Sequence, residues 1–104
     1  MGPEAKIERS VCRDAKRLLG VESFKWGVDG WPDRGFLTPG GTPLSIEFKA
    51  PREPPSPRQA ERMTCLRLWG YEVYVSDSYD HAMSTIKNLI DENSRSLLDK
   101  KRKI

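Results

Sequence analysis

An acidic residue and a lysine stand two positions apart in a segment whose alternation is typical of a β-strand. In Leu44-Ser45-Ile46-Glu47-Phe48-Lys49, apolar residues occupy every second position. Successive side chains of a strand point to opposite faces, so Glu47 and Lys49 are predicted to share one face while their apolar neighbours anchor the other. The strand would display a carboxylate and an ammonium group at a fixed short separation.

A second carboxylate, Asp33, lies just before another predicted strand at residues 35–38. The turn signal at residues 39–42, Pro-Gly-Gly-Thr, predicts an antiparallel hairpin that brings Asp33 beside Glu47. Mg²⁺ prefers oxygen ligands such as these carboxylates, and it lowers the pKa of a bound water. Lys49 could position that water or neutralise developing negative charge, so the set suits phosphodiester hydrolysis.

The remaining elements are expected to hold this hairpin in an α/β fold. Hydrophobic periodicity and turn residues predict a helix (3–19), three strands (23–26, 35–38, 44–49), a helix (57–69), a strand (71–75) and a helix from about residue 78. A hairpin followed by a helical crossover implies a mixed β-sheet flanked by helices, in the order α-β-β-β-α-β-α. We expect one domain over residues 1–92 and a basic C-terminal tail over 93–104, where no regular structure is predicted.

The composition is that of a soluble globular protein, with 37% hydrophobic and 32% charged residues. No segment approaches the ~20 consecutive apolar residues of a membrane span, and residues 1–4 lack the basic and apolar regions of a signal peptide. We therefore expect no membrane partner and a location in the cytoplasm of the host cell. Cys12 and Cys65 are predicted to be reduced thiols near the core. The single histidine, His81, argues against chemistry that needs two histidines.

The formal net charge of +3 is a weak indication of a polyanionic partner. Positive charge is most concentrated in Lys100-Lys101-Arg102-Lys103. This segment either contacts phosphates or forms a solvated, frayed tail, and the tail is favoured.

Several motifs occur in a characteristic order on the predicted elements. They are Glu4-x-x-Ile7, Trp31-Pro32-Asp33-Arg34, Ile46-Glu47-Phe48-Lys49-Ala50-Pro51, Ser56-Pro57-Arg58-Gln59 and the segment Gly70–Asp77. Together they resemble the PD-(D/E)XK nucleases and, more narrowly, the virus-type replication-repair nuclease (VRR-NUC) family. The resemblance extends from residue 4 to about residue 90, and it implies a restriction-endonuclease-like core with metal-dependent nuclease activity.

The resemblance also implies roles for the residues of the central motif. Asp33 and Glu47 would bind Mg²⁺ or Mn²⁺, with the backbone carbonyl of Phe48 as a third ligand. Lys49 would be the catalytic lysine.

Two helices would supply further site residues. Gln59 matches the helix glutamine that lies close to the catalytic lysine in the family. Glu4 matches the glutamate of the N-terminal helix that reaches the metal site through water, and Glu8 replaces it if the helix register is misread.

Stand-alone phage-type members of the family resemble Holliday junction resolvases and act as homodimers. The resemblance therefore implies a homodimer that cuts branched DNA, in particular four-way junctions, whose symmetry matches two active sites. Lys25, Arg34 and Arg58 flank the predicted site and are candidates for holding DNA phosphates.

Simpler explanations exist for these residues. Glu47 and Lys49 could form the solvent face of an edge strand, and Gln59 could be only a capping-box residue. Trp26 and Trp31 could stack on exposed bases, although core packing or a dimer contact is favoured.

Alternative functions also stay open. One is a flap or nicking nuclease with the same active site. Another is a catalytically idle nuclease fold that only binds DNA or a protein partner. The intact set of Asp33, Glu47 and Lys49 argues against the idle fold.

Overall fold

A four-stranded mixed sheet forms the centre of the protein. The computed structural model describes residues 2–39, 41 and 43–102, and from residue 95 on only the backbone. The strands lie in the order β1-β2-β3-β4, with β1–β2 and β2–β3 antiparallel and β3–β4 parallel. This is the predicted hairpin and crossover. The strands span Glu22–Lys25 (β1), Arg34–Leu37 (β2), Leu44–Phe48 (β3) and Glu72–Ser76 (β4).

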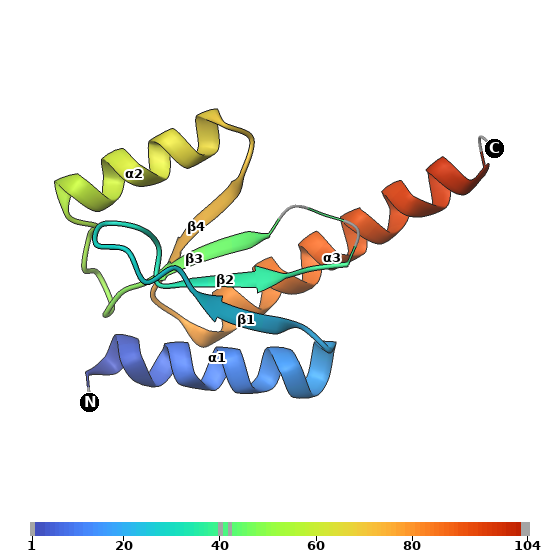
Figure 1. Ribbon diagram of the computed structural model, residues 1–104. Helices are drawn as coiled ribbons and strands as arrows, with labels where there is room; N and C mark the ends of the chain where they lie inside the picture. Colours follow the sequence, from blue (N-terminus) through green and yellow to red (C-terminus); the bar gives the residue numbers. More distant parts are fainter. Residues whose placement is uncertain (1, 40, 42, 103–104) are drawn as a thin grey trace.

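Helices cover both faces of the sheet (Figure 1). Helix α1 (Pro3–Leu19) and helix α3 (Tyr79–Arg102) pack on one face, where the main hydrophobic core lies. Helix α2 (Pro57–Leu68) covers the other face through a smaller cluster that includes Met63 and Leu66. The predicted α/β class and the order α-β-β-β-α-β-α are confirmed.

Strand β3 is buried along its whole length because it lies between β2 and β4. Its residues Leu44, Ile46 and Phe48 join the core beneath α1 and α3. Ser45 pairs with Val73, which packs against α2, so Ser45 and Glu47 face the α2 side. The interpretation of Glu47 as part of a solvent-exposed edge strand is therefore wrong.

The helix boundaries follow the predicted signals. Helix α1 begins with Pro3 and ends at Gly20, whose φ of 68° is left-handed and favours glycine. The side chain of Ser56 and that of Gln59 form the predicted capping box at the start of α2.

Helix α3 extends beyond the predicted domain and projects past the sheet (Figure 1). The prediction of no regular structure after Asn93 is wrong for residues 94–102, which are helical. From residue 79 to residue 102 the sequence contains neither glycine nor proline, and it is rich in residues with high helix propensity. The basic segment at residues 100–103 ends outside the described residues.

Two further predictions concern the cysteines and the membrane. Cys12 and Cys65 are free thiols of intermediate exposure, as expected. Among the residues that the structure describes, no helix has the length and apolar character needed to cross a bilayer.

A buried acidic residue ties α1 to α3. Asp14 is only 6% exposed, and its carboxylate accepts hydrogen bonds from Arg13 at 3.0 Å and from the Tyr79 hydroxyl at 2.7 Å. Arg17 lies 3.4 Å from the same carboxylate. The hydrogen bonds from Arg13 and Tyr79 hold the pKa of Asp14 well below its usual range.

We predict that Asp14→Asn lowers the melting temperature at neutral pH. The folded-state pKa of Asp14 is depressed, so its stabilisation is fully present above the unfolded-state pKa of about 3.9 and is lost as the pH falls towards the folded-state value. Thermal unfolding from pH 7 down to pH 3 should therefore show a difference between wild type and variant that shrinks with acidification. Asp91→Asn, at an exposed position of α3, is the control. A difference independent of pH would contradict the prediction.

Candidate active site

The Glu47 carboxylate lies at the centre of the predicted constellation. Although the residue is only 2% exposed, both of its oxygens have partners. Oε1 accepts a hydrogen bond from the Asp33 backbone N–H at 3.1 Å. Oε2 accepts one from Gln59 Nε2 at 2.6 Å and lies 3.3 Å from Lys49 Nζ. The structure thus brings four of the predicted residues together.

Asp33 is held against β3 from the loop that precedes β2. Its Oδ2 accepts a hydrogen bond from the Phe48 backbone N–H at 2.8 Å. Because the N–H and C=O of one residue in an extended strand point to the same side, the Phe48 carbonyl is also directed toward Asp33. This direction agrees with the third metal ligand implied by the family resemblance.

Two carboxylates at one buried position create an electrostatic demand for a cation. Burial, followed by the nearby Asp33 carboxylate, raises the pKa of Glu47 to about 7, although Lys49 partly opposes this shift. In the described part of the chain, no group of three or more His, Cys, Asp or Glu side chains is arranged to hold a metal. Mg²⁺ usually takes one or two carboxylates and completes its octahedron with water and substrate. The oxygens of Asp33, Glu47 and Phe48 therefore fit a hard divalent ion.

The Lys49 ammonium group lies between two acidic residues. Its side chain is 12% exposed, and Nζ lies 3.5 Å from Glu53 Oε1 in addition to its contact with Glu47. Glu53 belongs to a turn closed by its N–H to the Ala50 carbonyl. The sequence prediction missed Glu53, although its i,i+4 spacing from Lys49 was visible.

Gln59 performs both of the roles considered for it. Its Oε1 accepts the Ser56 N–H in the capping box at 2.9 Å, while its Nε2 donates to Glu47. The start of α2 thus fixes the orientation of the buried carboxylate.

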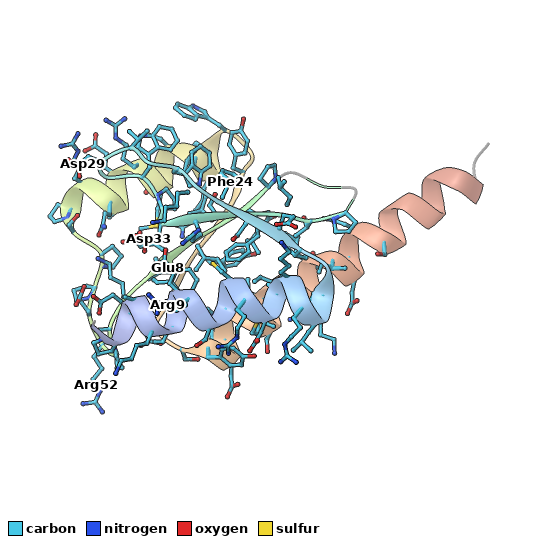
Figure 2. All side chains as sticks on the ribbon, turned by 60° about the horizontal axis from the view of Figure 1, so that its bottom comes forward. Glu8, Arg9, Phe24, Asp29, Asp33 and Arg52 are labelled. Carbon is cyan, nitrogen blue, oxygen red and sulfur yellow. The ribbon has the colours of Figure 1, made fainter. Side chains whose placement is uncertain are left out.

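The structure separates the two glutamates considered on α1. The carboxylate of Glu4 lies against the backbone of Gly2, where an added Cβ would be 2.7 Å from Glu4 Oε1. Glu8, in contrast, lines a cavity together with Asp33. Figure 2 shows Glu8 on α1 on the side of Asp33. Glu8 is thus the residue that α1 directs to the region of Asp33.

The three candidate phosphate ligands have different surroundings. Lys25 is exposed and lines the same cavity. Arg34 is mostly buried and forms an ion pair with Glu8 at 2.9 Å, so it faces the α1 side of the sheet. Arg58 is 60% exposed and pairs with Asp29 at 3.2 Å.

The tryptophans pack inside the protein, as favoured from the sequence. Trp26 donates through Nε1 to Ser45 at 2.9 Å and stacks on Trp31 with ring centroids 5.1 Å apart. The guanidinium of Arg62 lies 5.8 Å from the centroid of the Trp31 ring. Sequence reasoning missed Ser45 and Arg62, because their partners are 19 and 31 positions away.

Comparisons with known proteins agree with this site and fold. The chain is 34% identical over 80 residues to "Putative nuclease p44" of Acyrthosiphon pisum secondary endosymbiont phage 1, which covers 74% of this chain and 85% of that protein. Two solved structures, named "VRR_NUC domain protein" and "VRR_NUC domain", superpose with TM-scores of 0.71 at 24% and 23% identity. They cover 88% and 84% of this chain and 90% and 97% of their own. No family model matches.

The fold is therefore that of the VRR_NUC domain. The chain belongs to the same family as the phage protein, and the resemblance to the VRR-NUC family is confirmed.

We predict that Gln59→Ala destabilises the protein more than Ser56→Ala does. Ser56→Ala removes a helix cap worth about 1 kcal/mol. Gln59→Ala also leaves the buried Glu47 carboxylate without a hydrogen bond, which costs a further 1–3 kcal/mol or so. Urea unfolding of both variants measures the difference. Equal losses would show that the bond between Gln59 and Glu47 does not stabilise the fold.

Proposed function

We propose that the protein is a Mg²⁺- or Mn²⁺-dependent endodeoxyribonuclease. The observation that carries the proposal is the contact of Asp33 with Glu47 at the end of a buried strand, with the Lys49 ammonium group 3.3 Å from Glu47. The name and 34% identity of the phage relative support nuclease activity. We place the enzyme in the host cytoplasm, where its DNA substrate would be.

The residues divide the work of hydrolysis between them. Asp33, Glu47 and the Phe48 carbonyl would hold the divalent ion, which when bound activates a water and offsets charge on the phosphate. Lys49 would orient the attacking water or stabilise the negative charge that develops on phosphorus-bound oxygen. Gln59 keeps Glu47 in its ligating orientation. We assign the outer carboxylate to Glu8 in place of Glu4, because Glu8 lies on the side of Asp33.

The proposed substrate is branched DNA, cut by a homodimer. Two symmetry-related sites match the two strands cut in a four-way junction. A flap or nicking nuclease with the same residues is the second candidate. Lys25 and Arg58 are the exposed cations nearest to the loop before β2, and we propose that they hold phosphates.

We predict that Asp33→Asn, Glu47→Gln and Lys49→Met each reduce cleavage by about 10²-fold or more, since each removes charge needed in the transition state. Initial rates on labelled DNA with Mg²⁺ or Mn²⁺ measure the loss. Asp91→Asn, remote from the site on α3, is the matched control and should cut like wild type. Full activity of Asp33→Asn would contradict the assignment of the site.

The substrate class is tested with a labelled four-way junction, a flap and a linear duplex of the same sequence. We expect cleavage with Mg²⁺ or Mn²⁺ that a chelator abolishes, and paired cuts in the junction. Cleavage of the flap alone would favour the second candidate. Binding to DNA without cleavage of any substrate would indicate the idle fold and overturn the proposal.

A further inference from the structure

A cavity of about 330 Å³ lies beside Asp33, on the side away from Glu47's partners Gln59 and Lys49. It has the volume of a small-ligand site and exceeds what a hydrated ion alone would need. Figure 2 shows Glu8 and Asp29 on its two sides, on α1 and on the loop before β2. The lining residues are Glu8, Lys25, Gly27, Val28, Asp29, Trp31, Pro32 and Asp33.

The loop that walls the cavity is held in place before any ligand arrives. On its outer side, Asp29 forms an ion pair with Arg58 of α2. At its base, Trp31 is stacked between neighbours: Trp26 lies on it at 5.1 Å and Arg62 of α2 at 5.8 Å. A wall fixed to α2 by these contacts forms a preorganised site, so little ordering cost would oppose binding.

The charge of the lining indicates which part of a nucleotide it would accept. Three carboxylates, Glu8, Asp29 and Asp33, face a single ammonium group, that of Lys25. Arg34 binds Oε1 of Glu8, and Arg58 binds Oδ2 of Asp29, so each carboxylate keeps a second oxygen as an acceptor. Such a lining repels a phosphate but accepts the N–H groups of a base edge.

The cavity also offers an apolar contact. Val28 is 55% exposed and belongs to the lining, and Gly27 adds a stretch of wall without a side chain. A flat aromatic ring could therefore lie against backbone and Val28 while its polar edge meets the carboxylates.

We propose that this cavity binds one unpaired base of the DNA next to the scissile phosphate. The inference rests on the proposed nuclease function and deepens it. A base within a duplex is stacked and its pairing edge is occupied, so only an unpaired nucleotide can enter such a pocket. The enzyme then selects branched DNA with unpaired nucleotides at the branch, such as flaps, over fully paired DNA.

The test compares binding of two flap DNAs that differ by one base. The wild-type chain is titrated in chelator with a labelled flap that carries cytosine or an abasic site at successive positions around the branch. At one position, loss of the base should weaken binding by about 10-fold, the equivalent of 1.4 kcal/mol and within the range found for single-base contacts. Equal affinity at every position would overturn the proposal.

A filling substitution locates the effect in the cavity. Val28→Phe should weaken binding of the cytosine flap by about the same 10-fold and leave the abasic flap unchanged. Leu37→Phe, at a 53% exposed position of β2 outside the cavity, is the matched control and should retain the difference. If Val28→Phe retains the difference as well, the base binds elsewhere and the proposal is wrong.

These measurements do not depend on catalysis. Discrimination between the two DNAs without cleavage in Mg²⁺ would preserve the pocket and refute the proposed activity. Cleavage without discrimination would preserve the activity and refute the pocket.

Discussion

The structure depends on one buried charge, the carboxylate of Glu47 on the central strand. Burying a carboxylate is costly unless hydrogen bonds and opposite charges compensate for the lost water. Here the compensation comes from separate parts of the chain: the Asp33 backbone, the Gln59 amide at the start of α2 and the Lys49 ammonium group. These contacts restrict the hairpin and α2 to one relative placement. The same requirement that satisfies Glu47 thus assembles the candidate active site.

The sheet keeps stability and chemistry on different faces. Alternate residues of β3 pack into the core beneath α1 and α3, while Ser45 and Glu47 face α2. The face with the site has only a small apolar cluster around Met63 and Leu66. Polar contacts, including those of Trp26 with Ser45 and of Arg62 with Trp31, connect this face to the loop before β2. That loop in turn carries Asp33.

Local patterns in the sequence predicted most of the fold, because periodicity, capping and turn residues act over a few positions. The constellation of Asp33, Glu47 and Lys49 was predictable for the same reason, since one strand and one turn position it. The choice between Glu4 and Glu8 was not, because it depends on how far α1 slides along the sheet. The length of α3 was missed because its polar second half lacks a hydrophobic pattern. The cavity beside Asp33 arises from contacts between distant segments.

A crystal structure of the protein with Mn²⁺ would test the central claim most directly, because anomalous scattering locates the ion independently of activity. The account predicts a manganese peak between the carboxylates of Asp33 and Glu47, with the Phe48 carbonyl within about 2.2 Å, near the metal–oxygen distance of small hard cations. Manganese bound only at other residues, in a protein that cuts DNA, would contradict it.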